Sequence, residues 1–120
     1  MSADTGLTQE QMANLDNLFK SGLRAMEQDK PQDAVDAFTQ IIEHGFKNAV
    51  LLTTYGNALK ALKLFEKAIS ACQEAADLAP DNLPVLMNLG SAHLAAGDWK
   101  RATEVYQEAL GVFPGESEIH

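Results

Sequence analysis

The chain has 120 residues and a formal net charge of −8, a length that leaves no room for two ordinary globular cores. Hydrophobic residues make up 46% of it and charged residues only 22%, which excludes a disordered chain and predicts a packed core. The acidic excess disfavours nucleic acids and anionic membrane surfaces as partners.

The chain shows no sign of export or of a bound cofactor. The first residues carry neither a positive cluster nor an apolar run, so no signal peptide is expected. The single cysteine, Cys72, cannot form an intramolecular disulfide, which fits a reducing compartment. We therefore expect a cytoplasmic protein without a metal or cofactor.

One spacing recurs through the whole sequence, and it corresponds to a repeat of about 34 residues. It relates three sets of identical residues: Gly22, Gly56 and Gly90; Ala34, Ala68 and Ala102; and Leu18, Leu52 and Leu86. A glycine inside a helix costs about 1 kcal/mol relative to alanine. Three glycines at one position of the repeat therefore predict the close approach of a second helix, with the three alanines as the facing small residues.

Each repeat contains two stretches with apolar residues at helical spacing. In chain order the predicted helices are 8–28, 31–44, 48–62, 65–78, 82–95 and 98–111. Thr8 with Gln11 predicts a capping box at the first helix, Pro31 suits a first turn, and Gly97-Asp98 predicts an end followed by a new start. Residues 1–7 and 115–120 are expected to be frayed ends.

The pattern resembles the tetratricopeptide repeat, a helix–turn–helix unit of the same period. The third repeat carries the fullest set of matching residues: Leu86, Leu89, Gly90, Gly97, Asp98, Trp99, Ala102, Tyr106, Ala109, Leu110 and Pro114. The resemblance implies an all-α, right-handed α-solenoid of three repeats and six helices. The implied division is an extension with the early start of the first helix (1–14), repeats at 15–48, 49–82 and 83–114, and a tail (115–120).

The resemblance also implies a function, namely a non-enzymatic scaffold that binds a peptide or helix of another protein in a concave groove. Carried over residue by residue, the groove positions are Phe19, Leu23, Met26, Thr54, Asn57, Lys60, Met87, Asn88 and Ser91. The clamp for a C-terminal carboxylate found in one subgroup needs lysines and arginines at positions where this chain offers only Asn57 as a suitable residue. That subgroup is not expected.

Two other functions are weighed against this one. A stripe through Phe19, Leu23 and Met26 lies beside the expected core face of the first helix and needs a partner, which could be a ligand, Leu7 or a second copy. A structural protein that self-associates through this helix or through its ends, as a homodimer or end-to-end oligomer, is therefore the second hypothesis.

An enzyme is a distant third. Ser91 and His93 lie roughly 200° apart around one helix, so they cannot form a nucleophile and base pair. We expect His93 to be a hydrogen-bonded packing residue, Cys72 to be an inert core thiol, and Trp99 to pack between repeats. No residues show the spacing of a metal site.

Overall fold

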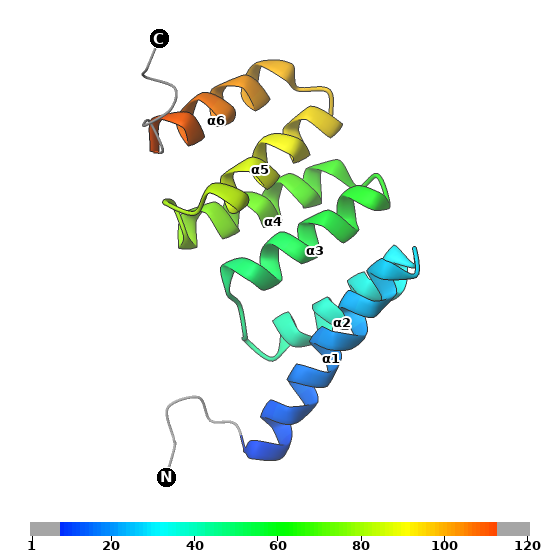
Figure 1. Ribbon diagram of the computed structural model, residues 1–120. Helices are drawn as coiled ribbons and strands as arrows, with labels where there is room; N and C mark the ends of the chain where they lie inside the picture. The colour runs from blue at the N-terminus through cyan, green and yellow to red at the C-terminus, as the bar shows by residue number, and fades with distance from the viewer. Residues whose placement is uncertain (1–7, 113–120) are drawn as a thin grey trace. The chain divides into compact units, whose positions relative to one another are not determined.

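The computed structural model describes residues 8–112, and the side chains of 8–111. This part of the chain consists of six helices without strands: α1 (Gln9–Glu27), α2 (Pro31–Glu43), α3 (Ala49–Ala61), α4 (Phe65–Leu78), α5 (Leu83–Ala95) and α6 (Trp99–Val112) (Figure 1). The predicted all-α class is confirmed, and each predicted helix end lies within one residue of the observed one.

Side-chain caps explain why the helices begin where they do. The Thr8 hydroxyl accepts a hydrogen bond from the Gln11 amide at 3.1 Å, and the Gln11 side chain accepts one from the Thr8 amide at 2.9 Å. This confirms the capping box. Asn48 and Asn82, which occupy the same position in successive repeats, cap α3 and α5 in the same manner, and the Asp98 carboxylate accepts from the Arg101 amide before α6.

The turn inside each helix pair uses one backbone conformation at equivalent positions of the three repeats. Asp29, Lys63 and Gly97 have φ angles of 60°, 64° and 87°. This left-handed conformation costs other residues more than glycine, and asparagine or aspartate tolerates it better than lysine. The sequence period is therefore also a period of the backbone.

The helices belong to two compact units. Unit 1 comprises residues 1–47 and contains α1 packed against α2, and unit 2 comprises residues 48–120 and contains α3 to α6. In unit 1 the core includes Leu15, Ala25, Ala34, Phe38 and Ile41. In unit 2 each helix packs against the next one along the chain, and α3 also lies beside α5.

The glycine positions do face a second helix, but the predicted alanine is among the nearest contacts only at Gly56. A Cβ on Gly22 would lie 2.4 Å from the ring of Phe38, and one on Gly90 would lie 2.5 Å from the ring of Tyr106. At Gly56 the nearest atom is the Cys72 sulfur, at 2.6 Å. Gly22 and Gly90 thus make room for an aromatic ring of the second helix, whereas Gly56 lies against the Cys72 sulfur, the Ala68 carbonyl and Ala71.

Several expectations concern residues outside the described range. They are the frayed ends at 1–7 and 115–120, the end of the last repeat at Pro114, and a contact from Leu7. Within the described residues, no helix is both long enough and apolar enough to cross a membrane.

Candidate functional site

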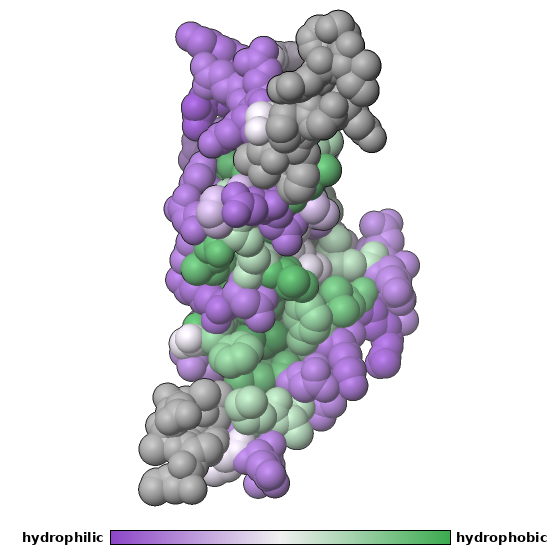
Figure 2. Space-filling view, turned by 60° about the vertical axis from the view of Figure 1, so that its left-hand side comes forward, coloured by the Kyte–Doolittle hydropathy of each residue, from purple (hydrophilic) through white to green (hydrophobic). Residues whose placement is uncertain are grey.

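In unit 2, α3 lies beside α5, and the predicted groove residues of this unit are on the exposed or half-buried surface of these two helices. We call this surface the α3/α5 face. Three apolar side chains on it are exposed, namely Val50, Met87 and Leu94, with exposed fractions of 63%, 45% and 42%. Hydrophobic and hydrophilic side chains alternate on the side of the molecule shown in Figure 2. The polar members of the face are half-buried: Thr54, Asn57, Lys60, Asn88 and Ser91.

A hydrogen bond links the two helices of this face. The Lys60 ammonium on α3 donates to the Ser91 hydroxyl on α5 at 2.8 Å, in a partly buried position. This bond holds a cation in the middle of the face. The sequence assigns both residues to the groove, and the structure brings them together across 31 positions of the chain.

The amide and hydroxyl groups of the face differ in what they still offer a ligand. Thr54 donates to the Val50 carbonyl at 2.8 Å, and the Asn88 amide donates to the Pro84 carbonyl at 2.9 Å. No side-chain hydrogen bond joins Asn57 to another residue in the described part of the chain. Asn57 is therefore the amide of this face with both its donor and its acceptor open.

The three predicted groove residues of unit 1 are not equivalent. Phe19 packs on the core residue Phe38, with ring centroids 5.8 Å apart, so its side chain belongs partly to the core of unit 1. Leu23 is 37% exposed and Met26 is half-buried. Within the apolar stripe that was expected to need a partner, Phe19 is thus covered by Phe38, whereas Leu23 is exposed.

His93 is where the structure departs most from the sequence prediction. Its side chain is buried at 6% exposure, as expected of a packing residue, but neither ring nitrogen has a hydrogen-bond partner among the described residues. The expected hydrogen-bonded histidine is therefore wrong. A buried polar atom without a partner costs about 1–3 kcal/mol.

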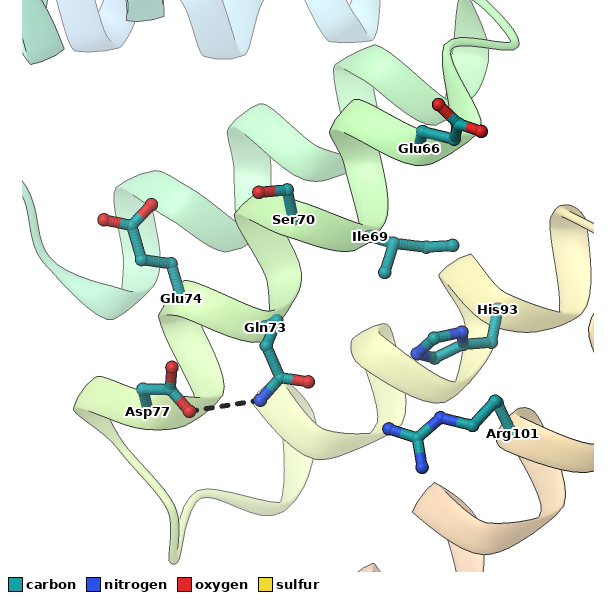
Figure 3. A pocket seen from close by; sticks show the side chains of 8 residues that line it. All are labelled: Glu66, Ile69, Ser70, Gln73, Glu74, Asp77, His93 and Arg101. Carbon is teal, nitrogen blue, oxygen red and sulfur yellow. Dashed lines mark hydrogen bonds between the residues drawn. The ribbon is translucent and has the colours of Figure 1, made fainter.

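His93 also lines an open pocket of about 480 Å³ between α4, α5 and α6, which the sequence did not predict (Figure 3). Three carboxylates of α4 line it, those of Glu66, Glu74 and Asp77, together with the guanidinium of Arg101. The sequence signal that could have shown it is the polar stripe of α4 at helical spacing, from Glu66 through Ser70 and Gln73 to Asp77.

The prediction for Cys72 is confirmed, whereas the prediction for Trp99 is wrong. Cys72 is buried, which confirms its interior position, and burial raises the pKa of its thiol although the nearby Lys60 ammonium lowers it in part. Trp99 is 70% exposed, so the predicted packing between repeats is wrong. Its counterpart in the preceding repeat, Phe65, is half-buried on α4, which α5 covers.

Comparison with solved structures places this fold among helical repeat proteins. The chain superposes on the tetratricopeptide repeat domain of Sgt2 from Aspergillus fumigatus with a TM-score of 0.78 and 25% identity, covering 92% of this chain and 71% of that one. The first such domain of Spaghetti (RPAP3), solved with the HSP90 peptide SRMEEVD, gives a TM-score of 0.75 and 26% identity, with 85% and 81% coverage.

The family model for the tetratricopeptide repeat matches residues 47–114, and the chain belongs to this family. Among curated proteins, it is 35% identical over 60 residues to the CTR9 homolog of Arabidopsis thaliana, and 32% identical over 87 residues to the human protein O-mannosyl-transferase TMTC1. These matches cover 50% and 72% of this chain, but only 6% and 10% of the two relatives.

Proposed function

We propose that this chain is a non-enzymatic protein-interaction module whose α3/α5 face binds a peptide or helix of a partner protein. The observation that carries the proposal is the arrangement of this face. An open amide (Asn57) and a fixed ammonium (Lys60) lie among three exposed apolar side chains. Such a surface suits a segment with apolar anchors and a backbone that needs hydrogen bonds.

The similarity to peptide-binding domains supports the proposal. The Spaghetti domain was solved with a bound peptide, and at 26% identity it covers most of this chain. Leu23 and Met26 are proposed as contact residues of unit 1 considered by itself. A cytoplasmic location remains a prediction from the sequence.

The test uses a peptide obtained by selecting a random library against the whole chain. Asn57→Ala combined with Asn88→Ala should weaken binding of this peptide by about 1–3 kcal/mol, because backbone groups of the ligand lose hydrogen bonds. The helical circular dichroism and the melting temperature should stay nearly unchanged, since both side chains are partly exposed. Gln107→Ala, an exposed amide on α6, is the matched control. Equal affinity of the double variant and the control would exclude the α3/α5 face as the site.

Self-association is the second candidate, and the outer side of α6 supports it. Leu110 is 54% exposed, whereas its counterpart Ala76 on α4 is buried, and Trp99 is exposed where Phe65 is half-buried. We propose that two copies pair through α6, because a two-fold dimer is the commonest closed arrangement.

Sedimentation at micromolar to millimolar concentration tests the second candidate. Leu110→Glu should convert an associating chain to a monomer, while Leu23→Glu on α1 should leave association intact. If Leu23→Glu alone disrupts it, the first helix is the contact. A wild-type chain that stays monomeric throughout would contradict both versions.

A further inference from the structure

The pocket between α4, α5 and α6 has the composition of a binding site. Most of its lining residues belong to α4, and all of these except Ile69 are polar. His93 and Arg101 extend toward them from α5 and α6 (Figure 3). A second hollow of about 520 Å³ shares Gln73, Asp77 and Arg101 with it and adds Glu108 and five apolar residues. The two hollows together form a groove along α4, which we call the α4/α6 groove.

The buried imidazole is the observation that points to a ligand. A neutral imidazole has one donor and one acceptor nitrogen, and both are unmet in His93 among the described residues. The fold does not need a polar residue here, because the equivalent positions of the two preceding repeats hold Leu59 and Ala25, both buried. A local conflict of this kind is expected where a side chain serves function and not stability.

The charge of the groove selects the ligand. Carboxylates of Glu66 and Asp77 line the pocket, and Glu108 lines its continuation. The Glu74 carboxylate also lines the pocket but already interacts with another group. Arg101, the guanidinium beside them, already donates to Glu104 at 2.8 Å on its own helix, so its charge is compensated. The groove is therefore negative, and a cation is the ligand it attracts.

A metal ion does not fit this groove. In the described part of the chain, no three His, Cys, Asp or Glu side chains lie close enough together to hold one. A longer organic cation can reach several of the separated carboxylates in turn. The Gln73 amide donates to Asp77 at 3.1 Å and so fixes one of them in place.

We propose that the α4/α6 groove is a second binding site, which takes lysine or arginine side chains of a basic protein segment. The carboxylates of Glu66 and Asp77 attract and pair with the cationic groups, and His93 accepts a hydrogen bond from one of them at the base of the pocket. The site is chemically distinct from the α3/α5 face, whose central charge is the ammonium of Lys60.

The experiment is an NMR titration of the ¹⁵N,¹³C-labelled full chain with an acetylated, amidated tetralysine peptide. The expected result is saturable binding with shifts at residues 66–77 and at the His93 ring. A tetraglutamate peptide of the same length should cause no such shifts. Raising the salt concentration should weaken binding, because exposed carboxylates are screened.

Three variants decide the assignment. His93→Leu and Asp77→Asn should each reduce the tetralysine affinity about tenfold or more, since each removes a hydrogen bond to a charged group. Asp81→Asn, an exposed carboxylate that does not line the groove, is the matched control and should bind like the wild type. Circular dichroism checks that all three are folded, and Asp77→Asn alters only an exposed side chain.

Two outcomes would overturn the proposal. Shifts that never saturate, or an equal effect of Asp77→Asn and Asp81→Asn, would mean general attraction to an acidic chain. If His93→Leu binds tetralysine with wild-type affinity, the imidazole is not part of the site, and its burial has no functional reason.

Discussion

The helix pairs α3/α4 and α5/α6 have nearly the same length and the same turn, but they differ at the positions that matter for binding. Where the two pairs hold the same residue, as at Gly56 and Gly90 or Ala68 and Ala102, that residue serves the packing of one helix on the other. Where they differ, as at Leu59 and His93, the fold tolerates both residues. A substitution in one helix pair can therefore be compared with the same substitution at the equivalent position of the other pair.

The largest changes in the free energy of unfolding are expected when Gly56 and Gly90 are replaced by a larger residue. Gly56 is enclosed by the Cys72 sulfur, the Ala68 carbonyl and Ala71, so Gly56→Leu should lower the free energy of unfolding by about 3 kcal/mol. Thermal and urea unfolding measure the loss. A melting temperature that rises would show that this position does not lie between two helices.

Gly90→Leu should cost less than Gly56→Leu. The three nearest atoms at Gly90 all belong to the ring of Tyr106, which is half-buried and can turn outward. Adding Tyr106→Ala to Gly90→Leu should recover part of the loss, whereas Cys72→Ala should help Gly56→Leu less, because the Ala68 carbonyl stays in place. Equal rescue at both sites would contradict this difference.

Replacing His93 by its counterpart should stabilise the protein. His93→Leu removes two buried nitrogens without partners and restores the residue type of Leu59, so the free energy of unfolding should rise by about 1–3 kcal/mol. Urea unfolding measures the gain, and the reverse exchange, Leu59→His, should be destabilising. A less stable His93→Leu chain would mean that the imidazole is paired in solution.

The turns should respond by smaller amounts. Lys63 adopts the left-handed conformation that Gly97 has in the next helix pair, so Lys63→Gly should stabilise by about 0.5–1 kcal/mol, and Gly97→Lys should destabilise by about 1 kcal/mol. Thermal unfolding of both single variants checks the pair. Effects of the same sign would contradict the shared turn.

The smallest effect concerns the pH dependence contributed by Cys72. Burial raises the pKa of its thiol, so as the pH rises above about 8.5 the unfolded chain loses the thiol proton before the folded chain does. The free energy of unfolding should therefore fall in that range. The stability of wild type relative to Cys72→Ala should be lower at about pH 10 than at about pH 7, and an unchanged difference would show that the thiol pKa is ordinary.

Local sequence patterns predicted the fold almost completely, because the signals that end and start helices are local. Thr8 with Gln11, Asn48, Asn82 and Asp98 each act within three residues of sequence. The resemblance to the tetratricopeptide repeat then assigned Lys60, Asn57 and Met87 to the groove.

The fine structure of the sites depends on contacts that the sequence pattern does not contain. The bond from Lys60 to Ser91 joins residues 31 positions apart. Phe19 packs on Phe38, whose ring lies against Gly22. The ring nitrogens of His93 lack partners because the described residues of α4, α5 and α6 place no hydrogen-bonding group beside them. A periodic pattern shows which side of a helix a residue occupies, but not which atoms meet it there.

The packing of unit 2 also has a consequence for the rate at which it forms. Each of its helices packs on its immediate neighbour in the chain, and the pairing of α3 with α5 is the longest in sequence among the described helices of this unit. Only short loops must close before these contacts are made, so the loss of chain entropy during assembly is small at every step. Helical proteins with such local contacts fold within microseconds to milliseconds. Rapid mixing should therefore show most molecules of unit 2 acquiring their helices and their buried Cys72 thiol together, on that timescale.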